Sequence, residues 1–325
     1  MRFPAPSAPA GGAVAFFRSA RTPTYHVPVL AEAVRTWAAG GARAVDATAG
    51  GGGHAALLRE QGGEVLAIDR DPDAIAAARR ALGDVRVRFV TGAFGAAATL
   101  DAIRAFRPDR ILLDLGVSSH QLDSAERGFT FRPGAPLDMR MDGRGITAAD
   151  VLNTWPAERL ADAFATLADE RPAFARRLGR SIVRRRERAS FATSDDLVNA
   201  IREVHGPRSG PADFARVFQA LRIVVNEELA QLEQALPALR DALVPGGRLG
   251  VISYHSGEDR IVKHAFRDWA RACICPPHQP VCTCRGRPLG RVLIGRGIQA
   301  DAAEVASNPR ARSARFRAFE VSDGG

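Results

Sequence analysis

The stretch Val45-Asp46-Ala47-Thr48-Ala49-Gly50-Gly51-Gly52-Gly53-His54 decides the fold. It predicts a strand, a glycine turn and the start of a helix, and the apolar run that follows ends in Asp69. Glycines let the backbone approach a bound nucleoside closely, and a carboxylate at the end of the second strand can accept hydrogen bonds from ribose hydroxyls. A further apolar strand, within residues 112–119, ends in Asp114. Three such strand ends at one edge of a sheet predict a nucleoside pocket.

Strands and helices alternate from Val27 onward. We expect strands at residues 43–48, 64–69, 85–90 and 110–115, and helices at residues 30–38, 54–60, 72–82 and 95–106. This alternation implies right-handed crossovers, and it predicts an α/β protein with a parallel, doubly wound sheet.

The alternation stops near residue 130. Helical patterns follow at residues 148–154, 157–168, 173–188 and 194–204. A long amphipathic helix then runs from Phe214 to Leu243, with Pro237 expected to break or kink it, before a strand at residues 248–254. We therefore predict three parts. Residues 1–22 form a disordered tail, residues 23–130 and 211–325 form the sheet domain, and residues 131–210 form an inserted helical substrate-recognition domain.

The composition favours a polyanionic partner. The chain has 325 residues, a net charge of +9 and a pI of about 10.6, which favours nucleic acid over membrane. Lys263 is the only lysine; a GC-rich genome would explain this arginine bias, but not the net charge. No apolar run approaches the roughly 20 residues that span a bilayer, and residues 13–17 are too short for a signal-peptide core. We expect a cytoplasmic protein with reduced thiols.

The glycine turn at residues 50–55 is weak evidence by itself, because it also fits the relaxed dinucleotide fingerprint. Three features favour S-adenosylmethionine (SAM) over NAD or a flavin. They are the helical insertion after the Asp114 strand, the Pro-Gly-Gly turn at residues 245–247 before a late strand, and the basic charge. A dinucleotide oxidoreductase stays as an alternative.

Longer motifs identify a family. They are His26-Val27-Pro28-Val29-Leu30, Asp114-Leu115-Gly116-Val117-Ser118-Ser119-His120-Gln121-Leu122-Asp123, Glu126-Arg127-Gly128-Phe129, Pro136-Leu137-Asp138-Met139-Arg140-Met141-Asp142, Phe218-Gln219-Ala220-Leu221-Arg222-Ile223 and Asn308-Pro309-Arg310-Ala311-Arg312-Ser313. From about Tyr25 to Glu320 the chain resembles the bacterial 16S rRNA cytosine-N4 methyltransferases of the MraW type. The resemblance implies a class I (Rossmann-like) fold and SAM-dependent methylation of the N4 amine of one cytidine in the decoding (P-site) region of 16S rRNA, within the 30S subunit. An alternative of another class is an RNA-binding ribosome-assembly factor that uses SAM as a structural ligand.

The resemblance also implies the residues that contact SAM. They are Gly52, Gly53, His54, Asp69, Phe94, Asp114 and Gln121. Without the resemblance, Phe94 also fits a core position, and His54 fits a polar position at a helix start. Three residues depart from the family pattern, because His120, Tyr254 and Gly257 stand where Pro, Phe and Leu are usual.

The reaction chiefly demands positioning, because the cytosine amine is a poor nucleophile and the sulfonium of SAM is already activated. Many amino-methyltransferases place an Asp/Asn-Pro-Pro-aromatic turn beside the amine, but here residues 114–117 read Asp-Leu-Gly-Val. Either Asp114 serves both ligands or another group accepts from the amine. Ser118 and His255 are candidate substrate residues, because both follow predicted strands; the alternative is that they only order their loops. We assign no catalytic residue.

Arginines gather in two places. One set lies on a single predicted helix: Arg171, Arg176, Arg177, Arg180, Arg184, Arg185, Arg186 and Arg188. We favour an RNA-facing surface over a solvated helix face, because the spacing covers more than one face. A second candidate patch comprises Arg310, Arg312, Arg315 and Arg317.

All four cysteines of the chain, Cys273, Cys275, Cys282 and Cys284, lie close together around His278. Four thiols in a reducing compartment suggest zinc. However, the Cys-x-Cys spacing is tighter than the usual two-residue gap. We therefore prefer reduced thiols in a surface loop, and we assign no metal ligand.

Overall fold

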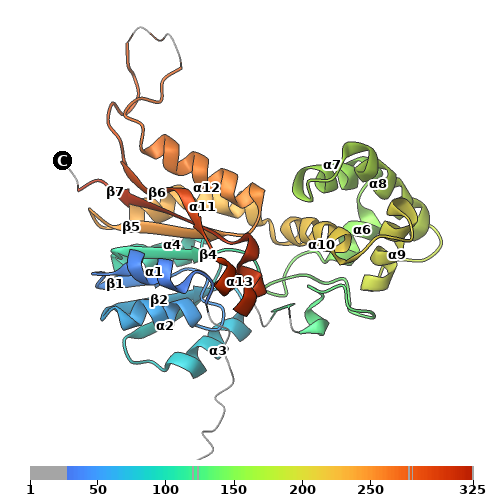
Figure 1. Ribbon diagram of the computed structural model, residues 1–325, viewed down its shortest axis with the longest axis horizontal. Helices are drawn as coiled ribbons and strands as arrows, with labels where there is room; N and C mark the ends of the chain where they lie inside the picture. The colour runs from blue at the N-terminus through green and yellow to red at the C-terminus, as the bar shows by residue number, and fades with distance from the viewer. Residues whose placement is uncertain (1–27, 119–120, 123, 277–278, 280, 324–325) are drawn as a thin grey trace, which may run out of the picture.

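A computed structural model describes residues 28–118, 121–122, 124–276, 279 and 281–323 (Figure 1). The tail predicted at residues 1–22 lies outside the described residues, as do His26, His120 and His278. None of the described helices is long and apolar enough to cross a bilayer.

A sheet of seven strands, within these residues, forms the centre of the molecule. The strands are β1 (Arg43–Asp46), β2 (Glu64–Asp69), β3 (Val87–Thr91), β4 (Arg110–Asp114), β5 (Arg248–Ser253), β6 (Gly290–Gln299) and β7 (Arg315–Val321). Their order is β3-β2-β1-β4-β5-β7-β6. The first five pair in parallel, and β7 runs antiparallel to both of its neighbours. The predicted parallel, doubly wound sheet is therefore confirmed, and an antiparallel pair is added at one edge.

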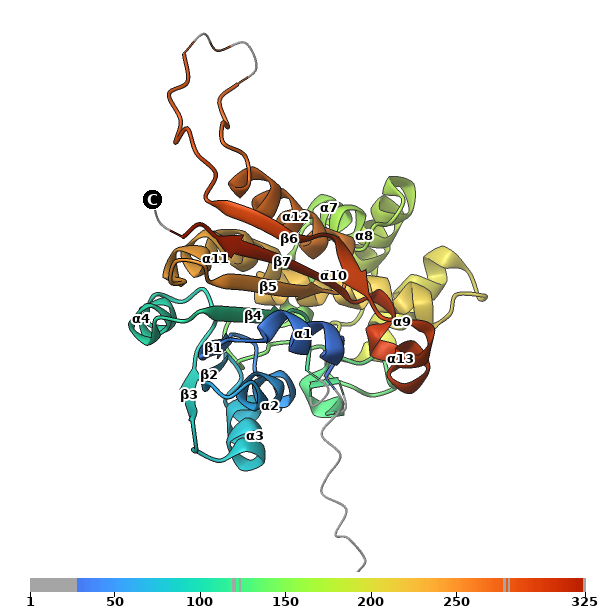
Figure 2. The ribbon, with the colours of Figure 1, turned by 60° about the vertical axis from the view of Figure 1, so that its left-hand side comes forward.

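Helices cover both faces of the sheet (Figure 2). One face packs against α4 (Ala97–Phe106), α11 (Glu228–Ala242) and α12 (Ser256–Trp269). The other packs against α1 (Ala31–Ala38), α2 (Gly53–Glu60), α3 (Pro72–Leu82) and η2 (Pro309–Ser313), which follows α13 (Ala302–Ser307). Both layers bury the apolar side chains of the strands, which holds the strand ends rigidly in place.

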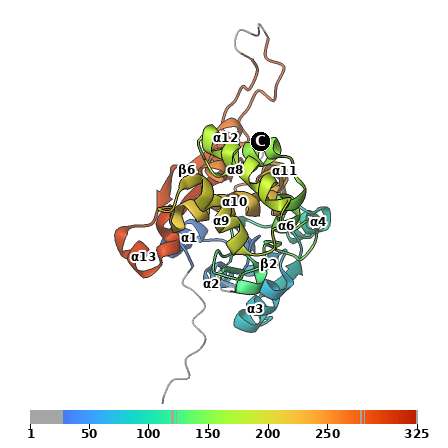
Figure 3. The same cartoon turned by 90° about the vertical axis from the view of Figure 1, so that its right-hand side faces the viewer.

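The chain between β4 and α11 is helical and lies beside the sheet (Figures 1 and 3). It forms η1 (Ala125–Arg127), α6 (Ala148–Thr154), α7 (Ala157–Leu167), α8 (Pro172–Arg186), α9 (Ser194–His205) and α10 (Pro211–Asn226). Helices α6 to α10 and the chain from Phe129 that leads to them share a hydrophobic cluster that extends from Phe129 to Leu221, and we call this region the helical lobe. The lobe therefore includes α10. The predicted boundaries of a separate inserted domain, residues 131–210, remain a prediction.

The expected break of the long helix at Pro237 is wrong. The helix ends at Asn226, Glu227 adopts a left-handed conformation with φ 51°, and α11 continues through Pro237. The cause is tertiary, because the Asn226 side chain accepts from the backbone N–H of Met141 at 2.9 Å and donates to the carbonyl of Met139 at 2.8 Å. Burial of α11 against the sheet offsets the hydrogen bond that Pro237 cannot donate.

Candidate functional site

A cavity of about 360 Å³ opens at the carboxyl ends of β1, β2, β4 and β5. Its wall includes residues 47–51, Gly53, His54, Asp69, Phe94 and residues 114–118. This volume lies within the range of small-molecule sites, roughly 300–1,000 Å³. The position is the one at which doubly wound folds bind ligands, outside the carboxyl ends of the parallel strands.

The glycine turn shapes one wall of the cavity. Gly52 caps α2 with φ 90°, and a Cβ there would approach Leu82 Cδ1 to 3.0 Å. Gly52 is therefore required by the turn itself and does not line the cavity, whereas its neighbours Gly51 and Gly53 do. The turn exposes its backbone to the cavity without intervening side chains.

Asp69 sits at the end of β2 and fastens this turn. Its carboxylate accepts the backbone N–H of Gly50 at 2.8 Å and that of Asp71 at 2.9 Å. Burial raises the pKa of Asp69 to about 6, and these two hydrogen bonds keep the pKa from rising further. At neutral pH the group is mainly ionised, and its remaining lone pairs are available to hydroxyl donors.

Asp114, at the end of β4, is held from two sides. The Tyr254 hydroxyl donates to Asp114 Oδ1 at 2.8 Å, and His54 Nδ1 lies 3.3 Å from Oδ2. Burial and the charge of Asp114 raise the pKa of Tyr254 well above its ordinary value, so the phenol remains a donor. The Asp114 carboxylate is thus fixed in orientation at the cavity wall.

His54 is buried, and both of its ring nitrogens are engaged inside the protein. Nε2 bonds to the carbonyl of Val29 at 2.9 Å, while Nδ1 faces Asp114. Burial lowers the pKa of His54, but the charges of Asp114 and Asp46 and the hydrogen bonds outweigh it and raise the pKa to about 9. The ring is therefore protonated at neutral pH and donates from both nitrogens. This arrangement orients Asp114, and the ring also forms part of the cavity wall.

Asp46 is fully buried behind this group, at the end of β1. Burial raises its pKa to about 7, with the charge of His54 acting in the opposite direction. One carboxylate oxygen, Oδ1, accepts from the backbone N–H of Thr48 at 3.3 Å. Neither Asp46 nor Tyr254 was among the site residues expected from the sequence, although both lie at carboxyl ends of strands, which is the signal that could have identified them.

Gln121 and Ser118 line the cavity and also order the loop after β4. The Gln121 side chain donates to Asp71 at 2.9 Å and accepts the backbone N–H of Ser118 at 3.0 Å. In return the Ser118 hydroxyl accepts from the N–H of Gln121 at 3.3 Å. Asp71 also pairs with Arg127 at 2.8 Å. These hydrogen bonds fasten the loop to the end of β2, and each side chain keeps some free hydrogen-bonding capacity.

The remaining two candidates differ in position. Phe94 is half-buried and lines the cavity beside the apolar layer of α4 and α11. His255 is not among the lining residues. It caps α12, with Nδ1 accepting from the N–H of Glu258, and its Nε2 lies 3.1 Å from the Glu258 carboxylate. Its neighbours Tyr254 and Glu258 line the cavity in its place.

The arginine-rich helix is α8, although Arg171 and Arg188 of the predicted set lie just outside its ends. The cations on the helix divide into two groups. Arg186 donates to the carbonyls of Leu152 and Trp155, and Arg184 and Arg185 pair with Glu203. Arg176 and Arg180 are exposed, which leaves them the better candidates for binding a polyanion.

The second predicted patch needs a correction. Arg317 is buried in β7 and pairs with Asp259 at 2.7 Å. It is therefore a structural cation of the sheet edge and no part of an exposed patch. By contrast, Arg310 lines the cavity.

The fold and the cavity together define a class of protein. A parallel sheet with an antiparallel β7 inserted between β5 and β6, a glycine turn after β1 and acids ending β2 and β4 are the features of class I, Rossmann-like methyltransferases.

Comparisons with known proteins make the identification more specific. The MraW methylase family matches residues 23–322, and the chain belongs to this family. A protein of Gemmatimonas aurantiaca named ribosomal RNA small subunit methyltransferase H is 55% identical over 306 residues, which cover 93% of this chain and 96% of that protein. Proteins of the same name from Heliobacterium modesticaldum and Rubrobacter xylanophilus are 44% and 48% identical; they cover 91% and 92% of this chain and 98% and 96% of their own. Family membership excludes the dinucleotide oxidoreductase alternative.

Proposed function

We propose that this protein uses SAM to methylate the exocyclic N4 amine of one cytidine in the decoding (P-site) region of 16S rRNA, within the 30S subunit. The observation that carries the proposal is the cavity at the strand ends, with Asp69 and Asp114 on its wall, in a member of a methylase family. The names of the relatives support small-subunit rRNA as the substrate. Because ribosomal subunits are assembled in the cytoplasm, that is where the enzyme would act.

The residues of the cavity fit SAM. The glycine turn gives backbone access, and the half-buried ring of Phe94 offers an apolar surface to an adenine. The Asp69 carboxylate faces the cavity with lone pairs that can accept from ribose hydroxyls. When bound, SAM would supply an electrophilic methyl group, and residues 114–118 form part of the wall that would hold it.

Asp114 is our candidate for orienting the amine. Its carboxylate is fixed by Tyr254 and His54, and each oxygen retains a lone pair for an N–H donor. A hydrogen bond from the amine to Asp114 would turn the nitrogen lone pair toward the methyl carbon. The new N–C bond forms as the S–C bond breaks, and the nitrogen then releases one proton. Ser118 lines the same region, whereas His255 caps α12 and acts only through the position of its neighbours Tyr254 and Glu258.

The helical lobe is our candidate for holding the RNA. The N4 amine lies on the Watson–Crick edge, so the target base must be unpaired or flipped out. The cavity wall includes Leu122 and Met141 from the segment that leads into the lobe, and Arg222 from α10. The lobe therefore adjoins the site at which a flipped base would enter, and the segment predicted at residues 131–210 would recognise the substrate.

The decisive experiment uses 30S subunits from cells that lack the protein. The purified enzyme and methyl-labelled SAM are added, the rRNA is digested, and the nucleosides are mapped by mass spectrometry. We expect N4-methylcytidine at one decoding-region position. Asp114→Asn should remove this product. The matched surface variant Asp101→Asn on α4 should retain it, because Asp101 is exposed, pairs with Arg104 at the surface and does not line the cavity.

Other products would reject the proposal in different ways. Methyl groups on carbon or on ribose would reject the N4 assignment, and modification of naked rRNA alone would reject the 30S subunit as substrate. Rescue of the knockout cells by Asp114→Asn, without any methylation, would favour an assembly factor that binds SAM as a structural ligand.

A further inference from the structure

The described part of the chain between α12 and β6, residues 271–276, 279 and 281–288, projects from the body of the molecule; we call it the cysteine loop (Figures 1 and 2). Helix α12 starts beside the cavity, at the carboxyl ends of the parallel strands, and its fourteen residues rise about 21 Å along the helix axis. The loop therefore emerges near the amino ends of these strands, far from the cavity. The backbone N–H of Leu289 donates to the carbonyl of Trp269 at 2.8 Å and closes the base of the loop. The loop is thus remote from the proposed chemistry.

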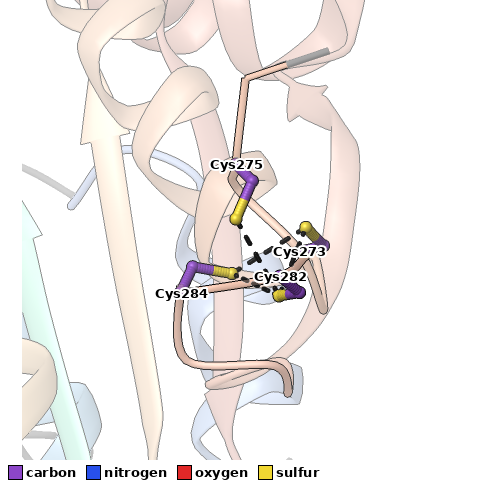
Figure 4. Close-up of side chains that lie close together, drawn as sticks. All are labelled: Cys273, Cys275, Cys282 and Cys284. Carbon is purple, nitrogen blue, oxygen red and sulfur yellow. Dashed lines mark hydrogen bonds between the residues drawn. The ribbon is translucent and has the colours of Figure 1, made fainter. Parts of the chain in front are cut away.

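Four sulfur atoms converge inside this loop (Figure 4). All four Sγ atoms lie within 4.8 Å of one another. The Sγ of Cys282 lies 3.7 Å from that of Cys273, 3.9 Å from that of Cys275 and 3.4 Å from that of Cys284, and Cys284 lies 3.8 Å from Cys273. A tetrahedron of sulfurs around zinc, with Zn–S bonds of about 2.3 Å, has S···S edges of about 3.8 Å. Three of the four separations, 3.7, 3.9 and 3.8 Å, lie close to this edge, and the Cys282–Cys284 separation of 3.4 Å is shorter.

In the described part of the loop, neither a disulfide nor a hydrophobic core holds the sulfurs together. All four cysteines are free, and separations of 3.4 Å or more are far from the roughly 2.05 Å of a disulfide. None of the described residues between 271 and 288 is buried, and the apolar side chains of Ile274 and Val281 are 47% and 70% exposed. Thiols attract one another only weakly, so the loop lacks both a core and a covalent link.

The surroundings suit a negatively charged tetrathiolate centre. Zinc bound to four thiolates carries a net charge of −2, and residues 271–288 contain Arg271, Arg285 and Arg287 but no Asp or Glu. The backbone N–H of Ile274 points to Cys284 Sγ at 3.4 Å, which stabilises a thiolate. Arg285 also donates to the carbonyls of Asp268 and Arg271 and fastens the loop to the end of α12.

We propose that Cys273, Cys275, Cys282 and Cys284 bind one structural zinc ion. Four protein ligands close the coordination sphere, so the ion holds the loop in shape and leaves no position for a substrate. Each Cys-x-Cys pair supplies two ligands from one side of the loop. The tight spacing that argued against zinc in the sequence is therefore compatible with a tetrahedral site, because the two pairs face each other across the loop.

The test measures metal in the full-length protein purified under reducing conditions. Elemental analysis should find one zinc per chain, and X-ray absorption should find four sulfurs at about 2.3 Å. The variant Cys273→Ala/Cys282→Ala removes one ligand from each pair and should retain below about a tenth of the parental zinc. The control Ile274→Ala/Thr283→Ala changes the exposed residues inside the same two pairs and should retain all of it.

SAM binding distinguishes a variant that has lost its fold from one that has lost only its metal. The cysteine variant should still bind SAM, because the cavity lies at the opposite ends of the strands from the cysteine loop. Protease sensitivity gained only within residues 271–288 would support the structural role. The proposal would be overturned if the parent protein, after incubation with zinc, contained no zinc and still had four reactive thiols. So would full zinc content in the cysteine variant, or iron in place of zinc.

Discussion

His54→Asn tests the charge relationships at the site through the pH dependence of stability. A base whose pKa is raised by folding stabilises the native state below its unfolded pKa, and this stabilisation is lost as the pH rises through the folded pKa. For His54 the pKa rises from 6.5 to about 9. Between pH 7.5 and 9.5 the parent protein should therefore lose about 2 kcal/mol of its free energy of unfolding.

The pH window separates His54 from its neighbours. In the parent protein, the pKa of the Asp46 carboxyl is raised to about 7. The ionisation of Asp46 therefore lowers the free energy of unfolding mainly below this window. The cysteine loop is the same in parent and variant, so its contribution cancels in the comparison. Urea unfolding of both proteins at the two pH values should show that the variant lacks about 2 kcal/mol of the parental decrease. A parental stability that does not change, or a variant that retains the whole parental decrease, would refute a protonated His54 bound to Asp114.

Three further predictions concern the cavity and α8. Asp69→Asn should weaken SAM binding by roughly 1–3 kcal/mol, because a ribose acceptor is lost; unchanged affinity in titration calorimetry would remove Asp69 from the site. Arg176→Ala/Arg180→Ala should make the plot of log binding constant for the 30S subunit against log salt concentration less steep. The slope should fall by about 0.7–0.9 for each phosphate that an arginine no longer neutralises, and the affinity for SAM should not change. Equal slopes would make α8 an ordinary solvated helix. Tyr254→Phe should cost about 1–2 kcal/mol of stability, because Asp114 loses a donor. Methylation should nevertheless persist, because His54 still holds the other oxygen of Asp114; an inactive but folded variant would contradict this.

The sequence was sufficient for the parallel half of the sheet, because short apolar strands bounded by turns and amphipathic helices are local signals. It was not sufficient for β6 and β7. In β7, Arg317 looks like an exposed cation until Asp259, from α12, is seen to pair with it. The helix break at Glu227 was missed for a similar reason, because Asn226 is held by the loop around Met139 and Met141, which is distant in sequence.

The candidate site likewise has a part that could be predicted from the sequence and a part that could not. Strand ends, the glycine turn and the family resemblance named nine site residues, and seven of them line the cavity, because the carboxyl ends of parallel strands meet at one edge. Gly52 and His255 are the two that do not. The sequence could not predict which side chains bond to one another. Tyr254 reaches Asp114 from 140 residues away, and His54 uses both nitrogens inside the protein. Likewise, the sequence favoured free thiols for the four cysteines, because spacing alone does not reveal that two Cys-x-Cys pairs face each other.

The continuity of the helical lobe has a consequence for the order of folding. Its hydrophobic cluster draws on one uninterrupted stretch from Phe129 to Leu221. In contrast, β4 cannot acquire its second neighbour until β5, which begins at Arg248, has been made. During synthesis the lobe can therefore close its own core while the sheet is still incomplete. The late strands β5, β7 and β6 would then complete the sheet beside a lobe that has already folded, so the cavity forms among the last parts of the molecule.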